Sequence, residues 1–391
     1  MLPFFIFVGR GRAYAEGRVR RPIRFSFLSL QAGNGLRHEP GFRGSGSFHG
    51  TACASLCLFI KFRIGMNSFG TKFRVTVFGE SHGKTVGVNI DGCPPGIPLT
   101  EADLLPDLAR RKSGARGTTP RQETDLPQIV TGVFNGFTTG APLTVLFENA
   151  NTRSGDYSNL VVQPRPGHAD RVSAEKYKGF TDYRGGGHFS GRITLGLVAA
   201  GAVAKKILKG VKVSARILEI GGCTETEKFP EVIEAALQDE DSVGGIIECV
   251  AEGCRPGWGE PFFNSVESLI GHAVFSVPAV KGIEFGAGFR AARMRGSEHN
   301  DPIVDAAGTT ATNHAGGING GIANGNPIVF RVAVKPTSSI GAPQRTFNRE
   351  TGKVEELVVH GRHDACIALR IPVIIEAVTA IVLADLALLH A

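Results

Sequence analysis

The sequence contains no paired CxxC groups at zinc-ligand spacing, no GxxxxGKS or GxxxxGKT loop, and no GxGxxG that follows a strand and opens a helix. The first absence argues against a zinc finger or ribbon. The other two argue against a P-loop NTPase and a Rossmann dinucleotide site. The cysteines number seven, and this odd count indicates a reducing, cytosol-like compartment.

Charge is scarce in the body of the chain. Charged residues make up 20% of the 391 residues, and the formal net charge is +7. Residues 1–65 hold nine Arg and one Lys against Glu16 and Glu39, so residues 66–391 carry 33 basic and 34 acidic residues. A near-neutral body does not provide the basic surface that nucleic-acid binding requires. We therefore expect no nucleic-acid partner.

The longest apolar run, residues 371–389, is interrupted by Glu376 and Asp385. Each carboxylate would cost roughly a few kcal/mol inside a bilayer. The run therefore predicts a buried C-terminal helix and no membrane partner.

The first 65 residues differ in composition from the rest. They are rich in Arg, poor in acidic residues and without a sustained helical or strand period, and a second methionine follows at Met66. The segment predicts a disordered leader. It is either an organelle transit peptide or sequence upstream of the natural start, and we favour the second. Residues 66–391 show no change in composition that would mark a linker, so we expect one domain there.

Hydrophobic periodicity predicts short strands and several helices after Met66. Strands are expected at residues 73–78, 85–90, 143–149, 245–250 and 328–334, and helices at 193–208, 231–237, 266–275 and 371–389. Thr100 and Asp103 form a capping-box-like pair, which predicts a further helix that ends at Arg110, Arg111 and Lys112. The turn-rich segment 150–187 predicts a functional loop.

Three histidines lie in polar, glycine-flanked loops: His82 in GESHG, His168 in RPGHAD and His363 in GRHDAC. A single such histidine is more often a surface residue or a satisfied core residue, but three in similar loops favour acid–base chemistry. No His-x-x-x-His pair marks a metal-binding helix, so we expect no metal.

Arginines gather around the same loops, at positions 110, 111, 116, 165, 192 and 362. The ordinary alternative is a solvated charged face, which glycine-rich surroundings weaken for Arg116, Arg192 and Arg362. Guanidinium groups in this number suit a small ligand with several negative charges.

Two other interpretations remain open. GESHG is similar to the GxSxG nucleophile elbow of serine hydrolases, with Ser81 as nucleophile, but the strand expected at 85–90 leaves no helix after the turn. Alternatively, the Arg-rich residues 1–65 bind RNA or another anionic surface, which leaves the histidine loops unexplained.

Six segments together resemble the chorismate synthase family. They are, in the family's order, FGESHGKTVGVNIDGCPPGIPLTEADL, RPGHAD, DYRGGGHFSGR, NHAGGINGG, KPTSS and GRHDAC. They span essentially all of residues 66–391, which the resemblance makes one catalytic domain. GRHDAC alone is a weak signal, whereas GESHG running on into CPPGIPLTEADL is specific.

The resemblance implies a carbon–oxygen lyase that makes chorismate from 5-enolpyruvylshikimate 3-phosphate, the last common step of the shikimate pathway to aromatic amino acids. The reaction is an anti 1,4-elimination of the carbon 3 phosphate and a carbon 6 hydrogen, without net redox change. Reduced FMN is the implied cofactor, because that carbon–hydrogen bond is barely acidic and the flavin lends electron density as the phosphate leaves. The implied fold is an α/β fold of the α+β type, a sandwich of antiparallel sheets with surrounding helices.

The resemblance also implies roles for individual residues. His82 matches the histidine that protonates the departing phosphate, His168 the histidine beside the reduced flavin, and Asp364 the aspartate that helps relay the substrate proton. The implied substrate-binding residues are Ser81, Arg111, Arg116, Arg192 and Arg362. The implied flavin-binding residues are His188, Phe189, Ser190, Gly320, Lys335, Pro336, Thr337, Ser338, Ser339 and Arg362.

The chain departs from the family pattern in two places. Many members carry Arg-Ser-Ser where this chain has His188, Phe189 and Ser190, and Pro278 stands where others have a polar residue. Ser190 keeps its place, and His188 retains a hydrogen-bond donor.

The implied partners are a small anionic substrate, other copies of the chain in a homotetramer, and an external source of reduced flavin. Some fungal members carry their own NADPH-dependent flavin reductase. No added segment for it is visible here, so we expect a monofunctional enzyme that depends on NADPH only indirectly, through a separate reductase. The expected location is the cytoplasm, or a plastid if residues 1–65 are a transit peptide.

Overall fold

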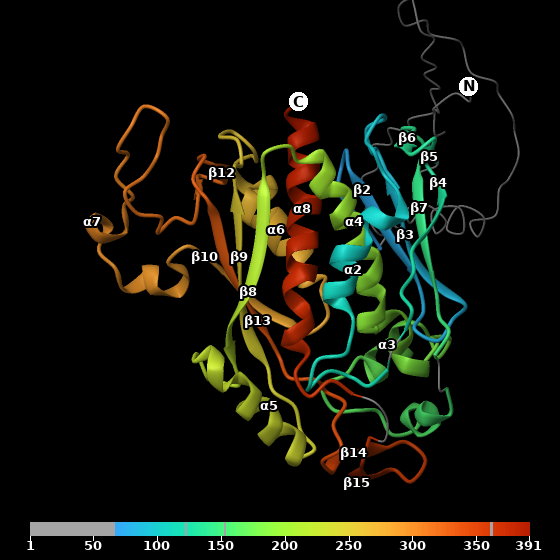
Figure 1. The fold of residues 1–391 in the computed structure, drawn as a ribbon. Coiled ribbons are helices and arrows are strands. Elements are labelled where there is room, and N and C mark those ends of the chain that lie inside the picture. Colours follow the sequence, from blue (N-terminus) through green and yellow to red (C-terminus); the bar gives the residue numbers. More distant parts are fainter. Residues whose placement is uncertain (1–66, 122, 152–153, 360–362) are drawn as a thin grey trace, which may run out of the picture. The chain divides into compact units, whose positions relative to one another are not determined.

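Two antiparallel sheets form the framework of the chain (Figure 1). The computed structural model describes residues 67–121, 123–151, 154–359 and 363–391. The first sheet has the order β1 (Ser68–Phe69), β2 (Arg74–Gly79), β3 (Thr85–Asp91), β7 (Leu143–Glu148) and β4 (Gln128–Thr131). The second has the order β10 (Val280–Phe285), β13 (Ile328–Val334), β9 (Gly245–Glu252) and β8 (Lys212–Ile220).

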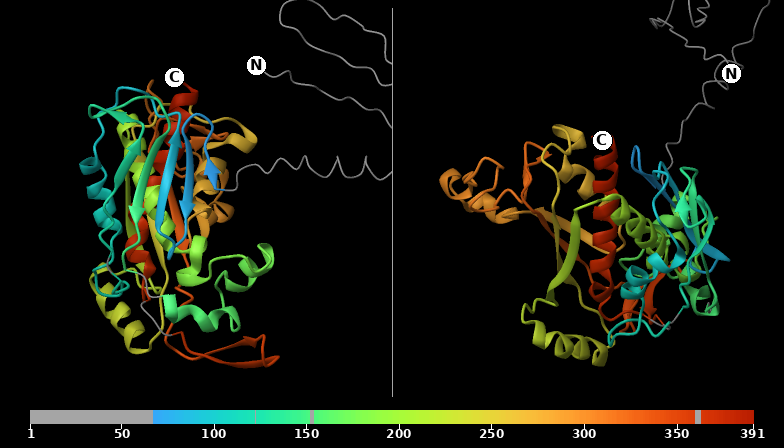
Figure 2. Two further views of the ribbon diagram at one scale, coloured as in Figure 1. Left: turned by 90° about the vertical axis from the view of Figure 1, so that its right-hand side faces the viewer. Right: turned by 45° about the horizontal axis from the view of Figure 1, so that its top comes forward.

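The two longest helices, α4 (Thr194–Ile207) and α8 (Ile371–Leu389), lie between these sheets. Helix α4 packs against β2, β3 and β7, helix α8 packs against β8 and β9, and the two helices pack along each other. The right-hand view in Figure 2 shows the same order around the red α8. The predicted α+β fold with antiparallel sheets is confirmed, although these two helices lie between the sheets rather than around them.

Small residues set the spacing of these layers. A Cβ atom added at Gly201 in α4 would lie 2.3 Å from the Cβ of Ala377 in α8, and one added at Gly196 would lie 2.9 Å from the carbonyl oxygen of Gly87 in β3. Neither position has room for a side chain. The small and apolar sequence of α4 therefore lets a helix and a sheet approach it closely from opposite sides.

The shorter elements surround this core. Helix α2 packs against α4 and α8, and α6 packs against α8 and β10. The helices are η1 (Glu101–Asp103), α2 (Leu105–Arg111), η2 (Ser154–Val161), α3 (Asp170–Lys176), η3 (Arg184–Phe189), η4 (Gly191–Ile193), η5 (Thr226–Lys228), α5 (Phe229–Gln238), η6 (Phe262–Asn264), α6 (Val266–Phe275), η7 (Gly288–Arg293), α7 (Gly296–His299) and η8 (Ile367–Arg370). Three hairpins complete the set: β5–β6 (Val133–Phe134, Phe137–Thr138), β11–β12 (Ile318–Asn319, Ile322–Ala323) and β14–β15 (Gln344–Asn348, Lys353–Leu357).

Most predicted elements are present. The expected strands correspond to β2, β3, β7, β9 and β13, and the expected helices to α4, α5, α6 and α8. The helix expected from Thr100 begins as the 3-10 turn η1 and continues as α2, and the amide of Thr100 donates to Asp103 Oδ2 at 2.8 Å. Strands β8 and β10 and helix α3 are absent from the sequence-based prediction. The predicted leader, residues 1–65, lies outside the described residues.

Two carboxylates tie the apolar helix α8 into the fold. Asp385 accepts the backbone amides of Thr71, Lys72 and Phe73 at 2.6–2.9 Å. Glu376 accepts both terminal nitrogens of Arg110 at 2.7 Å. Helix α8 is long and apolar enough to span a membrane, but fifteen of its residues are buried inside the protein. The prediction of a buried C-terminal helix is confirmed.

Candidate active site

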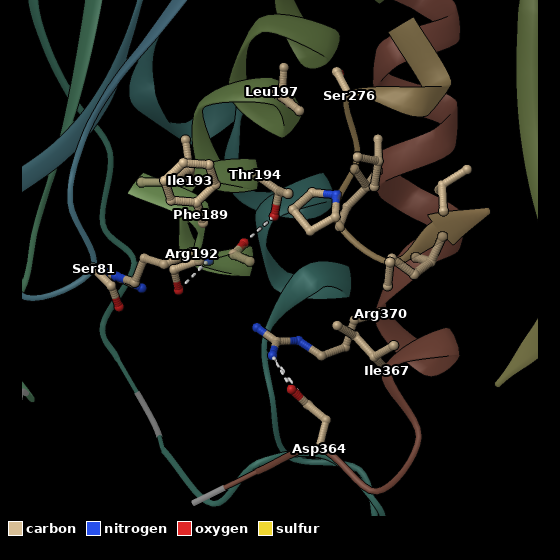
Figure 3. Close-up of a pocket in the computed structure, with 18 of the residues that line it drawn as sticks. Ser81, Phe189, Arg192, Ile193, Thr194, Leu197, Ser276, Asp364, Ile367 and Arg370 are labelled. Atoms are coloured by element: carbon tan, nitrogen blue, oxygen red, sulfur yellow. Dashed lines mark hydrogen bonds and ion pairs between the residues drawn. The ribbon is translucent and has the colours of Figure 1, made fainter. Parts of the chain in front are cut away.

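One cavity of about 950 Å³ brings together loops that are far apart in the sequence (Figure 3). Ser81 lines it from the turn between β2 and β3, Arg165 and His168 from RPGHAD, Lys335 from KPTSS, and Asp364 from GRHDAC. The volume is at the upper end of the range of roughly 300–1,000 Å³ that ligand pockets occupy. Four of the six segments that carry the family resemblance therefore face one space here, and DYRGGGHFSGR faces it as well.

The predicted site residues divide into three groups. Those that line the cavity are Ser81, Arg111, His168, His188, Phe189, Ser190, Arg192, Lys335, Thr337, Ser338, Ser339 and Asp364. Those that do not line it are His82, Arg116, Gly320 and Pro336. Arg362 lies outside the described residues.

The cavity wall is strongly cationic. Eight lysine and arginine side chains line it against three carboxylates, those of Glu123, Asp125 and Asp364. Apolar side chains such as Leu197 line another part, on the side opposite Asp364 in Figure 3. This combination suits a ligand set with several negative charges and a sizeable apolar surface.

Asp125 holds two buried arginines in this wall. It accepts Arg192 Nη1, and its other oxygen lies 3.8 Å from Arg111 Nη1. The remaining nitrogens of Arg192 donate to Asn149 Oδ1 at 2.6 Å and to the carbonyl of Glu148 at 3.1 Å. All three guanidinium nitrogens of Arg192 thus have protein partners, so this side chain stabilises the cavity wall.

Arg111 is held by neutral partners. Its Nε donates to Thr194 Oγ1 at 2.9 Å and its Nη2 to the carbonyl of Gly191 at 2.7 Å. Burial, together with the nearby charge of Arg370, lowers the pKa of Arg111 to about 9. Arg111 therefore keeps its positive charge at neutral pH, and an anion beside it would be attracted strongly.

Arg121 connects Ser81 to a buried carboxylate. It donates to Ser81 Oγ at 3.2 Å and to Glu123 Oε1 at 2.6 Å. Glu123 also accepts the backbone amide of Ala150 at 3.1 Å. The guanidinium is thereby fixed at the cavity edge with the Ser81 hydroxyl beside it.

Asp364 is held at the opposite side of the cavity by a backbone amide and an arginine (Figure 3). Its Oδ1 accepts the amide of Thr119 at 3.0 Å and Arg370 Nη1 at 3.3 Å. Arg370 Nε in turn donates to the carbonyl of Arg111 at 3.0 Å. Residues 119, 364 and 370 therefore form one connected group that also supports the backbone of Arg111.

His82 lies directly behind the cavity wall, with 8% of its surface exposed. Its ring packs edge-on against Tyr157 at 5.2 Å between centroids. A Cβ atom on Gly185 would lie 2.6 Å from His82 Nε2, so this nitrogen lies close to Gly185, which lines the cavity. Burial, followed by the charges of Arg121 and Arg184, lowers the pKa of His82 below 6.5.

His168 stands beside an arginine–aspartate pair. Its Nδ1 lies 2.6 Å from Asp170 Oδ1 and 3.0 Å from Arg165 Nη2. Although burial opposes the charge, hydrogen bonds from Arg165 and His168 hold the pKa of Asp170 well below its usual range. Asp170 is therefore an anion throughout the physiological pH range.

The KPTSS loop is attached to the His168 loop by two hydrogen bonds. Arg165 Nη1 donates to Ser339 Oγ at 2.7 Å, and Ser338 Oγ donates to the carbonyl of Gly167 at 2.8 Å. Lys335 Nζ donates to Ser338 Oγ at 2.6 Å. Burial and the charge of Lys281 lower the pKa of Lys335. Two lysines that share one wall of a cavity favour a bound anion between them.

The three residues of the HFS segment, His188, Phe189 and Ser190, make different contacts. His188 Nδ1 lies 2.8 Å from the carbonyl oxygen of Gly79, and its Nε2 lies 3.1 Å from Asn67 Oδ1. Ser190 caps η4, because its hydroxyl accepts the amide of Arg192 at 3.3 Å. Phe189 is 38% exposed and lines the cavity. The hydroxyl of Ser190 and both ring nitrogens of His188 are thus engaged by protein groups.

Three predicted residues lie away from the cavity for identifiable reasons. Arg116 is largely exposed and donates through Nε and Nη2 to Glu234, at 2.8 Å each. Gly320 forms the turn of the β11–β12 hairpin with φ +60. Pro336 is exposed next to Lys335. In this chain alone, none of the three contributes to the wall of the cavity.

The similarity to known proteins covers most of the described chain. The family model described as chorismate synthase matches residues 73–388. The chorismate synthase of Chitinophaga pinensis is 67% identical over 326 residues, which are 83% of this chain and 97% of that protein. That of Ignicoccus hospitalis is 47% identical over 351 residues, which are 82% of this chain and 92% of that protein. A crystal structure of chorismate synthase aligns with a TM-score of 0.63 at 27% identity and covers 82% of this chain and 93% of the other.

The chain belongs to the chorismate synthase family. It is a lyase that forms chorismate by eliminating phosphate from 5-enolpyruvylshikimate 3-phosphate, a step in the biosynthesis of aromatic amino acids. The predicted resemblance and reaction are confirmed. The interpretation of GESHG as a hydrolase elbow is wrong, because β3 and not a helix follows the turn and the Ser81 hydroxyl accepts a hydrogen bond from Arg121.

Several residues that line the cavity are absent from the sequence-based site: Arg121, Glu123, Asp125, Lys281 and Arg370. Asp170, which lies beside His168 but does not line this cavity, is absent as well. A signal was present for three of them, because RQETD packs Arg121, Glu123 and Asp125 into one short charged loop after the Arg-rich helix end. Arg370 immediately precedes the apolar run of α8. A single cation in that place indicates the end of a helix and not a substrate-binding residue. Among the described residues, no group of three or more His, Cys, Asp or Glu is placed to hold a metal ion.

Proposed function

We propose that this cavity binds 5-enolpyruvylshikimate 3-phosphate together with reduced FMN, and that the elimination takes place in it. The observation that carries the proposal is the convergence of five sequence segments on one space with eight cationic side chains. The substrate has two carboxylates and a phosphate, so several cationic partners are needed to compensate its charge. A volume of about 950 Å³ is large for one small ligand and suits two.

The substrate end is assigned to Arg111, Arg121 and Arg370, which line the cavity around Ser81 and Asp364. Each has at least one nitrogen fixed by a carbonyl, hydroxyl or carboxylate of the protein, so little entropy is lost when an anion binds. Arg192 is assigned a supporting role. Direct contacts from Arg116 and Arg362 remain predictions from the family resemblance, and Arg116 would have to leave Glu234 to make one.

The flavin is assigned to the wall formed by KPTSS and the HFS segment. The donors there fit it: Lys281 and Lys335 suit its phosphate, and the buried hydroxyl of Thr337 has no hydrogen-bond partner among the described residues. Apolar side chains such as Leu197 and Ile374 suit its ring system. When bound, reduced FMN supplies the electron density that lets the phosphate leave from a carbon skeleton with no acidic hydrogen.

His82 is the proposed general acid for the departing phosphate. In the described structure, burial and two nearby arginines favour its neutral form. A substrate phosphate next to Ser81 would reverse this balance, because a dianion within a few ångströms stabilises an imidazolium. The proton is then available where the carbon–oxygen bond breaks, and only when substrate is present.

His168 and Asp364 are the other proposed catalytic groups. Asp364 is anchored by Thr119 and Arg370 on one side of the cavity, which places a carboxylate where it can help carry the proton from carbon 6. His168 lines the cavity beside the KPTSS loop and stabilises the protonation state of the reduced cofactor.

The proposal includes how the enzyme is assembled and supplied. The chain forms a homotetramer, acts in the cytoplasm, and receives flavin that is reduced elsewhere. Proteins that resemble it occur in bacteria and archaea. The exposed aromatic side chains of Phe262, Phe263 and Phe289 support self-association. The plastid remains the alternative location if residues 1–65 direct import.

The deciding experiment is anaerobic turnover of 5-enolpyruvylshikimate 3-phosphate by the full chain with chemically reduced FMN. Chorismate and inorganic phosphate should appear in equal amounts, and no turnover should occur with oxidised FMN and NADPH. His82→Ala and His168→Ala should each reduce the rate by roughly 100- to 10,000-fold. His390→Ala, at the exposed end of α8, is the matched control and should not change it.

The outcomes separate the parts of the proposal. Activity without any flavin would refute the cofactor assignment. Wild-type rates in both histidine variants would refute their roles. Turnover with NADPH and oxidised FMN would show that the chain reduces its own flavin.

A further inference from the structure

The side chain of Asp170 is 9% exposed and lies next to His168, but it does not line the main cavity. It opens helix α3, and it lines instead a separate cavity of about 120 Å³ on the far side of His168. His168 lines both cavities and so forms part of the wall between them. Asp170 therefore does not touch a ligand in the main cavity, and any effect it has on the reaction passes through a neighbour.

The contacts of Asp170 determine which nitrogen of His168 carries hydrogen. Oδ1 of Asp170 lies 2.6 Å from His168 Nδ1 and also accepts Arg165 Nη2 at 2.7 Å. An ionised carboxylate only accepts hydrogen bonds, and two acceptors would repel each other at 2.6 Å. Arg165 Nη2 also lies 3.0 Å from Nδ1, but it donates to Asp170 Oδ1 at 2.7 Å, so the shorter contact between Nδ1 and Asp170 decides the tautomer. The hydrogen of His168 is therefore on Nδ1, and Nε2 is the nitrogen without one.

Arg165 balances the charge of Asp170 and fixes its orientation. Nε and the backbone amide of Arg165 donate to Asp170 Oδ2 at 2.8 and 3.1 Å, and Nη2 donates to Oδ1. With 4% and 9% of their side chains exposed, the two charges neutralise each other away from water. The pair therefore orients His168 without adding net negative charge beside the reduced cofactor.

The guanidinium of Arg165 also contacts the KPTSS loop, to which the flavin is assigned. Arg165 Nη1 donates to Ser339 in KPTSS at 2.7 Å, so one planar group joins Asp170 to Ser339. Three nitrogens of this one side chain thus hold Asp170, the partner of His168, and the KPTSS loop in a fixed relation.

We propose that Asp170 is a positioning residue for the elimination, which acts with Arg165 to keep the hydrogen of His168 on Nδ1 and to direct Nε2 at the cofactor. The assignment rests on the proposed role of His168. In Asp170→Asn, the carboxamide can donate to Nδ1 and so favours hydrogen on Nε2, the opposite tautomer, while the volume of the side chain is unchanged.

The test combines kinetics with a direct view of the ring. Asp170→Asn should reduce kcat by about 10- to 100-fold, by analogy with loss of the carboxylate that orients a metal-bound histidine, with little change in KM for the substrate. The double variant with His168→Ala should be no slower than His168→Ala alone, because Asp170 acts through His168. Glu175→Gln, which removes an exposed ion pair from the same helix, should leave kcat unchanged.

Nitrogen-15 NMR of the enzyme labelled at histidine shows directly which ring nitrogen of His168 carries hydrogen. Hydrogen should be found on His168 Nδ1 in the wild type and on Nε2 in Asp170→Asn. Hydrogen on Nε2 in the wild type would overturn the inference, as would losses from Asp170→Asn and His168→Ala that multiply in the double variant. If His168→Ala turns over normally, the proposed role of His168 fails instead, and the two failures are distinguishable.

Discussion

Asp125 and Arg192 form an ion pair that is buried on both sides, with 4% and 7% of their side chains exposed. Asp125 adopts φ +51, a backbone conformation that a residue with a side chain rarely holds without support from its surroundings. Arg111 lies on the other side of the same carboxylate, and Arg370 repels Arg111. One carboxylate thus separates mutually repelling arginines in a cavity that must receive an anion.

Loss of Asp125 should destabilise the protein strongly. Asp125→Ala leaves Arg192 and Arg111 buried without their counter-charge, which typically costs about 3–5 kcal/mol. Urea unfolding of the unliganded protein measures the loss. Glu225→Ala is the control, because its partner Lys228 is about half exposed and such pairs contribute about 0–1 kcal/mol. Equal losses in the two variants would show that Asp125 has no special electrostatic role.

Binding of an anion should raise the pKa of His82. In the free protein, burial, Arg121 and Arg184 hold this pKa below 6.5, so the neutral ring predominates at pH 7. The contribution of the neutral His82 ring to the free energy of unfolding is complete above pH 6.5. It is lost as the pH falls through the pKa of His82 in the folded state. The chemical shift of the His82 Cε1 proton should titrate below pH 6.5 without ligand and at higher pH with inorganic phosphate. Arg184→Gln should also raise the midpoint, and a midpoint insensitive to both changes would contradict the arrangement.

Gly185→Ala should impair catalysis far more than folding. At φ +58 any side chain is strained by about 1–2 kcal/mol, and this methyl would also lie 2.5 Å from the ring of His82 and displace it. A displacement of about 1 Å can reduce turnover by about 100-fold. The matched control is Gly222→Ala, with φ +86 and no atom within 4 Å of the new methyl, which should show the same loss of stability at normal kcat. Similar kcat values in the two variants would count against a catalytic His82.

Glu376 should make the protein sensitive to acid. Burial raises the pKa of Glu376. Hydrogen bonds from Arg110 and Ala215 and the charge of Lys205 outweigh this effect and keep the pKa below 4.5. Its contribution is present above pH 4.5 and is lost as the pH falls below that value. Glu376→Gln should lower Tm at pH 7, equivalent to about 1–3 kcal/mol, and should flatten the dependence of Tm on pH below 4.5. The exposed Glu175→Gln should do neither, and an unchanged Tm in Glu376→Gln would refute the prediction.

Local patterns predicted the regular elements well where one periodicity dominates. Helix α6 has the predicted bounds, and β13 coincides with residues 328–334, where alternate residues from Ile328 to Val334 are buried on one face of the sheet. Strand β8 was harder to predict, since its alternation breaks at a register shift between Ile217 and Glu219. Helix α3 is seven residues long and polar, and its first residue is engaged by Arg165 rather than by a local cap.

The sequence by itself determined the family, the reaction and the loops that carry the motifs, because order and spacing along the chain are local properties. Only the tertiary structure decided what each charged side chain faces. Arg110 and Arg111 are neighbours in α2, yet Arg110 meets Glu376 of α8 and Arg111 enters the cavity, since successive helical residues point about 100° apart. Asp125 and Arg192 are 67 positions apart and meet only after two sheets and two helices have packed.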